Sequence, residues 1–145
     1  MELIQRIIHA LTELHPIHPM LVHFPIALTG AGALFILLAV WKKSKMLEQA
    51  AFANIVLAAF GTLAAGLTGM MDNVNTYDGA APNATWKILL ALILLAVTAV
   101  TSIARWRNPN LFESRAKPLY VTAYLVSFVL AITLAFLGAI ILYGF

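Results

Sequence analysis

Residues Trp86–Trp106, with the sequence WKILLALILLAVTAVTSIARW, indicate the class of fold. Between Lys87 and Arg105 this stretch has no charged side chain, and it is long enough to cross the hydrocarbon core of a bilayer, which takes about 20 residues of helix. Backbone amides in lipid must be satisfied within the segment, so the stretch should be helical. It therefore predicts a transmembrane helix.

Three further stretches of the chain have the same character. They lie near Met20–Trp41, Ala50–Met71 and Leu119–Phe145. Hydrophobic residues make up 62% of the 145-residue chain and charged residues only 10%, too few to cover the surface of a soluble protein. The sequence predicts an all-α, integral membrane four-helix bundle that forms a single domain over residues 1–145.

The loops between these spans predict the orientation. Two loops on the same side hold seven basic residues: Lys42, Lys43, Lys45, Arg105, Arg107, Arg115 and Lys117. The other side has only Arg6 and Lys87. The positive-inside rule places the basic loops in the cytoplasm. We therefore expect a multi-pass protein of a bacterial inner membrane, with both termini on the non-cytoplasmic side.

The N-terminus and the absence of cysteine narrow the possibilities further. Met1-Glu2 is unlike the basic start of a signal peptide, and Leu3, Ile4 and Ile7 share one helical face. This pattern predicts a short amphipathic helix, either lying on the membrane or packed on the end of the bundle. A chain without cysteine has no disulfide, thiolate metal site, covalently attached c-type haem or iron–sulfur ligand of its own.

Small residues recur every four positions in two of the spans. The fourth span has Ala123, Ser127, Ala131, Ala135 and Ala139, and the second has Gly61, Ala65 and Gly69. Small side chains let helix backbones approach closely in lipid. Each stripe predicts a close helix contact, within this chain or with a partner.

The stretch 15–25, HPIHPMLVHFP, contains three histidines and three prolines. Pro16 and Pro19 interrupt a helix that arrives from the N-terminus, and Pro19 can begin the first span. Pro25 lies deeper, so it should kink the helix or mark its true start. A proline also frees a carbonyl one turn earlier, close to His23.

The predicted topology gathers the distinctive polar residues at one end of the bundle. This end receives His15, His18, His23, Met70, Met71, Asp72, Trp86, Lys87 and Tyr143, whereas the other end shows only basic loops. Placing an ionisable side chain in a membrane-spanning segment costs free energy, so residues of this kind mark a candidate functional site. We therefore expect any site at the non-cytoplasmic end.

Three interpretations of this cluster remain open. In the structural one, His23 bonds Asp72 or a freed carbonyl, and His15, His18, Asp72 and Lys87 complete a polar cluster. In the second, His18, His23 or Met70 binds haem b, with two ligands in this chain or one from a second subunit. In the third, imidazoles and Asp72 bind zinc or copper. The chain shows no nucleophile–base pattern or phosphate loop, so we expect no enzyme.

The segment His18–Leu28, HPMLVHFPIAL, resembles the opening motif of a prokaryotic family of four-helix membrane proteins, the domain-of-unknown-function 2231 family. The resemblance continues with Thr68-Gly69-Met70-Met71-Asp72 and with Gly138 and Tyr143-Gly144, over nearly the whole chain. Some relatives are fused to Rieske-type domains, which implies a redox neighbourhood. Family members sometimes have histidine at the start of the third span, where this chain has Thr85-Trp86-Lys87.

Together these features predict a non-enzymatic membrane subunit beside a redox or energy-converting complex. The expected partners are lipids and other membrane subunits or further copies of the chain, and not nucleic acid. We expect no cofactor. The alternative is a small b-type cytochrome with haem at the non-cytoplasmic end.

Overall fold

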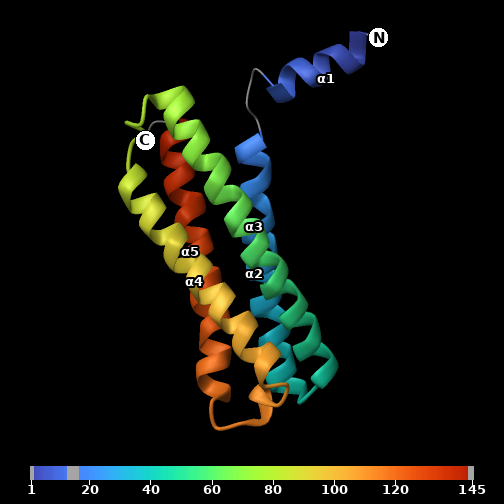
Figure 1. Cartoon of the computed structure of the whole chain (residues 1–145). Coiled ribbons are helices and arrows are strands. Elements are labelled where there is room, and N and C mark those ends of the chain that lie inside the picture. The colour runs from blue at the N-terminus through green and yellow to red at the C-terminus, as the bar shows by residue number, and fades with distance from the viewer. Residues whose placement is uncertain (1, 13–16, 144–145) are drawn as a thin grey trace.

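The computed structural model is a bundle of four long helices with a fifth, short helix leading away from one end (Figure 1). It describes the backbone of residues 2–12 and 17–143. For residues 2–8 and 17–140 it also describes the exposure and contacts of the side chains. The elements in chain order are α1 (Glu2–Thr12), α2 (Ile17–Lys42), α3 (Lys45–Tyr77), α4 (Ala84–Arg107), the 3-10 turn η1 (Leu111–Glu113) and α5 (Lys117–Tyr143). No β-strand occurs in these described ranges, so the all-α prediction is confirmed.

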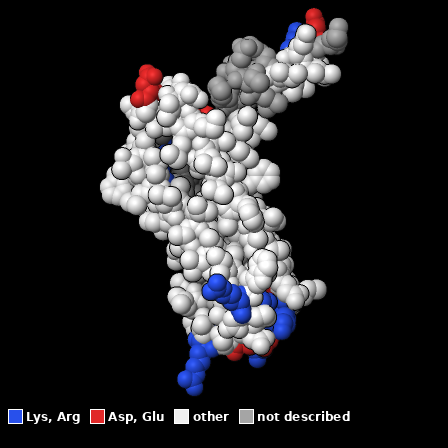
Figure 2. Space-filling view, in the orientation of Figure 1, with Lys and Arg blue, Asp and Glu red and all other residues white. Residues whose placement is uncertain are grey.

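Helices α2 to α5 are each long and apolar enough to cross a membrane, as the sequence predicts. At most 33% of the most apolar window of any of these helices is buried inside the bundle, so most apolar side chains face outward. In Figure 2 the waist of the molecule is almost free of charge, and lysine and arginine gather at one end. This surface suits contact with lipid, and the chain is a membrane protein.

The two ends of the bundle differ. We call the end formed by the start of α2, the end of α3 and the start of α4 the histidine end, and the opposite end, with the α2–α3 and α4–α5 connections, the lysine end (Figure 1). The α2–α3 connection is short because Lys43 adopts a left-handed conformation with φ of 51° directly after α2, and Ser44 then caps α3 by accepting from the Leu47 amide.

Helix α3 is longer than the sequence analysis predicts. It begins at Lys45 and continues to Tyr77, so its 33 residues span about 50 Å against a hydrocarbon core of about 30 Å. The sequence analysis ends the second span near Met71 and begins the third near Trp86, which implies a loop over residues 72–85; the first part of this loop is helical instead. The helix ends where Asp78 adopts a left-handed conformation and the Gly79 amide donates to the Asn73 carbonyl.

Small residues bring α2 and α3 together. A Cβ on Gly61 would lie only 3.3 Å from Cδ of Pro25, so the glycine leaves room for the proline ring. Pro25 is buried inside a helix that runs on without a break to Lys42. Thr29 donates to the Pro25 carbonyl at 2.6 Å. Pro25 therefore does not mark the start of the span, and its ring packs against the glycine face of α3.

The small-residue stripe of α5 is buried within this chain at its centre. Ser127 and Ala131 are 0% and 1% exposed. On adjoining positions of α5, the Tyr124 and Phe128 rings lie against glycines of α2, Gly32 and Gly30. The stripe thus belongs to the packing of the four-helix bundle.

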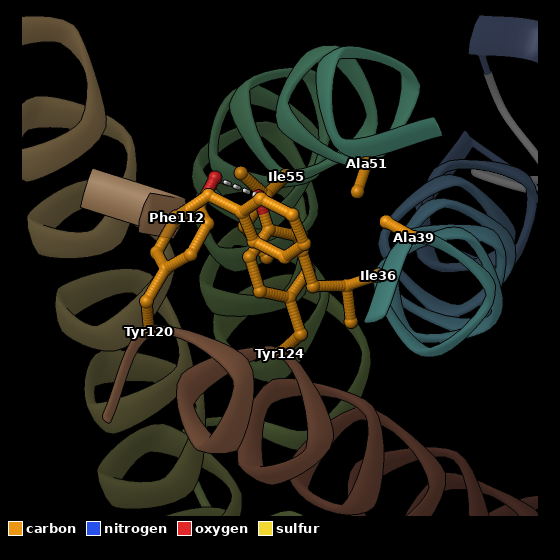
Figure 3. Packing of buried hydrophobic residues seen from close by; sticks show 7 residues of the cluster. All are labelled: Ile36, Ala39, Ala51, Ile55, Phe112, Tyr120 and Tyr124. Atoms are coloured by element: carbon orange, nitrogen blue, oxygen red, sulfur yellow. Dashed lines mark hydrogen bonds between the residues drawn. The ribbon is translucent and has the colours of Figure 1, made fainter. Parts of the chain in front are cut away.

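The buried core lies toward the lysine end. Its cluster combines residues of α2, α3, η1 and α5 (Figure 3): Ile36, Ala39, Ala51, Ile55, Phe112, Tyr120 and Tyr124. The rings of Tyr120 and Tyr124 pack edge to face, with centroids 5.2 Å apart. Aromatic and branched side chains thus fix three helices and η1 at this end.

Helix α1 keeps its apolar face open. Leu3, Ile4 and Ile7 are 71%, 64% and 49% exposed, so the described bundle does not cover them. Glu2 and Arg6, 3.9 Å apart, form an exposed ion pair on the same helix. Of the two interpretations of this segment, the exposed apolar face favours a helix that lies on the membrane surface.

Candidate functional site at the histidine end

His18 is held against α3 at the histidine end. Its Nδ1 lies 3.2 Å from the Thr68 hydroxyl, and its ring lies over Gly69. A Cβ at position 69 would be 2.7 Å from Cε1 of His18, which is closer than real side chains approach. Glycine at this position therefore makes room for the imidazole.

The hydrogen bonds of Thr68 assign the tautomer of His18. The Thr68 hydroxyl lies 3.0 Å from the Ala64 carbonyl and 3.2 Å from the Ala65 carbonyl, and it donates its single proton to these acceptors. It must then accept from Nδ1–H of His18. Nε2 is left as the atom of His18 that can accept a proton or a ligand.

Two side chains of opposite charge surround His18. Asp72 of α3 and Lys87 of α4, both half-buried, interact with it electrostatically. The structure thus brings together three residues that the sequence analysis selected, from three different helices. Among the described residues, no group of three or more His, Asp or Glu side chains is arranged to hold a metal ion. His15 lies outside the described residues.

His23 does not belong to this cluster. Its side chain is exposed, and its Nδ1 lies 2.6 Å from the Pro19 carbonyl oxygen, to which it donates. The predicted hydrogen bond between His23 and Asp72 is replaced by this bond within α2. Nε2 of His23 therefore faces away from the helix axis, beside the exposed side chains of Met20 and Phe24.

The described ligand candidates do not converge on one haem. His18 and His23 are five positions apart, so they project from the helix about 140° from each other. His18 is packed on α3 while His23 is exposed, and Met70 is 56% exposed. Two described histidines of one chain thus do not fit the two axial positions of one iron. The outward ring of His23 fits a site shared with another subunit.

The strongest polar network lies at the opposite end, where the sequence analysis predicts only loop charges. Arg105 of α4 donates from Nε and Nη2 to the two carboxylate oxygens of Glu48, at 2.6 and 2.9 Å. Tyr120 of α5 donates to Glu48 at 2.9 Å and lies 2.9 Å from the Tyr124 hydroxyl. Glu48 is 1% exposed and Arg105 7%.

The prediction of an ordinary basic loop at Arg105 is therefore wrong. Arg105 lies in the last turn of α4 and Glu48 in the first turn of α3, and these two antiparallel helices meet at the lysine end. The sequence contains a signal for this ion pair: an acidic residue at the start of one span and a basic residue at the end of the next. The network binds α3, α4 and α5 together, and no buried side-chain nitrogen or oxygen of the described residues lacks a hydrogen bond.

Comparison with known families agrees with this architecture. Residues 14–145 match the family described as "Predicted membrane protein (DUF2231)", and the chain belongs to this family. The expected resemblance is thereby confirmed. Neither the curated proteins nor the solved structures yield a match.

Proposed function

We propose that the protein is a non-enzymatic membrane subunit that works beside a redox or energy-converting complex of a bacterial inner membrane. Its histidine end and both termini would then lie on the non-cytoplasmic side. The observation that carries this proposal is the outward position of His23 on α2. Three ionisable side chains of the helices at this end, His18, Asp72 and Lys87, are at least half-buried, whereas Asp78 lies exposed in the turn after α3.

The depth of His23 makes its exposure unusual. The ring lies about 9 Å along α2 from Ile17, and α2 is about 39 Å long. With the helix centred on a core of about 30 Å, His23 lies inside the hydrocarbon layer near its edge. Polar side chains in membrane helices face a protein interior or a water-filled cavity in nearly all cases. A partner that covers this face would supply the missing acceptor or donor for Nε2.

The residues around His23 are suited to such a contact. Met20, Phe24 and Ala27 follow the spacing of one helix face, and all are exposed. A flexible methionine and an aromatic ring are side chains enriched at protein interfaces. The redox setting is supported by the family resemblance, because some relatives are fused to Rieske-type domains.

The size of the complex in native membranes tests this proposal. We expect the wild-type protein, extracted in mild detergent, to migrate on native gels in an assembly with other subunits. His23→Leu should release it, because the polar contact is lost while the volume is kept. Leu92→Ala, at an exposed position of α4, should leave the assembly intact. A wild-type protein that migrates alone would contradict the proposal.

A haem shared between subunits is the second candidate. Histidines that bind metals usually donate their other ring nitrogen to a carbonyl or carboxylate, and His23 does this with the Pro19 carbonyl. Its Nε2 would hold the haem iron together with a residue of a partner subunit. Haem would supply electron transfer at the histidine end, with the apolar face of α2 excluding water.

The visible spectrum tests the haem candidate separately. It predicts a Soret band in the purified assembly that His23→Ala abolishes and His18→Ala leaves in place, because His18 is packed on α3. A colourless assembly from haem-sufficient cells would eliminate this candidate, while the native gel would still decide the first.

A further inference from the structure

The lysine end contains a cavity that the proposed function does not use. Its volume is about 350 Å³, near the lower limit for small-molecule sites, and it is lined by Lys43, Lys45, Phe112, Glu113 and Lys117. The residues come from four parts of the chain: the α2–α3 connection, the first residue of α3, η1 and the first residue of α5. Three lysine ammonium groups thus line one cavity.

The positive charge of this cavity is only partly compensated. Glu113 is its one carboxylate, and it lies 3.8 Å from Lys45 with both side chains more than half exposed. An ion pair of this kind is weak. Nζ of Lys117 lies 4.5 Å from the centroid of the Phe112 ring. This cation–π contact leaves the lysine charged. The cavity therefore has room for a further anion.

Two helix dipoles add to this field. Lys45 is the first residue of α3 and Lys117 the first of α5, so both cations lie at the positive ends of helices. Cations are unfavourable at these positions, and an anion there is favourable. Lys43 lines the same cavity from a left-handed backbone conformation in which glycine is usual. An anion would offset the repulsion among these groups.

An apolar groove on the outer surface reaches the same end of the bundle. It lies between α4 and α5, and it is lined by Ala96, Val97, Val100, Thr101, Ala104, Leu111, Ala116, Leu119, Tyr120 and Ala123. Leu111 and Ala116 of the groove are the sequence neighbours of Phe112 and Lys117 of the cavity. A cationic cavity at the ends of the spans thus lies beside an apolar channel along them.

We propose that this end of the bundle binds an anionic phospholipid. The phosphate lies among Lys43, Lys45 and Lys117, and an acyl chain follows the α4–α5 groove. A free anion would use only the cavity, and a soluble acidic protein would leave the groove empty. A lipid matches both surfaces at the depth where polar and apolar layers of a membrane meet.

Lipid binding to the purified protein tests this proposal. We expect phosphatidylglycerol to raise the midpoint of thermal unfolding in detergent by roughly 2–6 °C more than phosphatidylcholine does. Native mass spectrometry of the wild-type protein should show phosphatidylglycerol retained in preference to phosphatidylcholine. Equal effects of the two lipids in both measurements would overturn the proposal, whatever the variants do.

Matched variants locate the site. The triple variant Lys43→Gln, Lys45→Gln, Lys117→Gln should bind phosphatidylglycerol on the order of 100-fold more weakly, since each basic residue near a lipid surface contributes about 1 kcal/mol. The control Lys42→Gln, Arg107→Gln, Arg115→Gln removes the same charge at the same end, outside the cavity, and should keep most of the binding. Equal losses would indicate diffuse attraction and contradict a site.

Soluble probes separate a lipid from other anions. Glycerol phosphate presents the anionic part without acyl chains, and polyglutamate represents an acidic protein segment. Neither should reproduce the shift in unfolding midpoint produced by phosphatidylglycerol. A full shift with either probe would overturn the lipid assignment.

Discussion

The buried pair of Glu48 and Arg105 is the most costly feature of the molecule at the scale of single residues. Both charges leave water, and their two mutual hydrogen bonds, the hydrogen bond of Tyr120 and the contact of Arg105 with the Phe52 ring compensate for this. Removing one member of such a pair leaves the other uncompensated. The network should therefore behave as a unit when it is mutated.

A mutant cycle measures this coupling. Arg105→Gln should destabilise the protein by about 3–5 kcal/mol because it strands the Glu48 carboxylate, and adding Glu48→Gln should restore part of the loss. Glu113→Gln, which breaks the exposed pair with Lys45, should cost only about 0–1 kcal/mol. Unfolding in detergent gives the four values, for Arg105→Gln, Glu48→Gln, the double variant and Glu113→Gln, and strict additivity of the two buried changes would contradict a shared network.

The glycine beneath His18 gives a second test at this scale. Gly69→Ala places a Cβ 2.7 Å from the imidazole, so we expect His18 to shift and the unfolding midpoint to fall. Gly66→Ala on the same helix meets nothing within 4 Å and should be neutral or stabilising, since alanine favours helix. Similar midpoints for the two variants would show that His18 is not packed on Gly69.

At the residue scale, topology alone decides the end of the bundle at which a residue lies. Antiparallel spans necessarily bring His18, Asp72 and Lys87 to one end, and the structure places them together. The direction of each side chain depends on where the helix begins and how it is rotated about its axis. The proline-rich start of α2 made both difficult to predict. For this reason His23 was expected beside Asp72 but faces outward. The sequence analysis counted Arg105 among the loop residues, because its partner Glu48 is distant in sequence and no nearby residue indicates the pairing.

At the scale of elements, α5 is organised by its small residues. Ser127 and Ala131 are buried, whereas Val129, two positions away from each, is 62% exposed. The repeat of four seen in the sequence thus marks the inner face of the helix. The sequence did not show which neighbour this face contacts, because both α2 and α4 are available to it.

Overpacking tests the inner face of α5. Ala131→Leu should destabilise the bundle by about 1–3 kcal/mol, because a buried position without free volume must accept a larger side chain. Val129→Phe adds bulk on the exposed face and should have a much smaller effect. Unfolding midpoints in detergent compare the two, and equal changes would place the helix contact elsewhere.

Element boundaries were less predictable than element number. Hydropathy gave the centres of four spans, but the ends of α3 depend on the Ser44 cap and the left-handed turn at Asp78. Most residues after Met71 are polar, yet α3 continues through them to Tyr77, beyond the length that a bilayer requires.

At the scale of the whole molecule, charge separates the two ends of the bundle. Lysine and arginine gather at one end (Figure 2), and the positive-inside rule predicts that this end is cytoplasmic. Reporter fusions at Ser44 and Asn110, one in each connection of the lysine end, should be active only with a cytoplasmic reporter. Activity of a periplasmic reporter at both positions would reverse the orientation.

The central claim is that another protein covers the outward face of α2 around His23. Photo-crosslinking in native membranes tests it most directly, with a photoreactive amino acid at Phe24 and, as control, at Val100 on α4; these side chains are 59% and 65% exposed. We predict a discrete protein adduct from position 24 and only lipid adducts from position 100. Lipid adducts alone from position 24 would contradict the account.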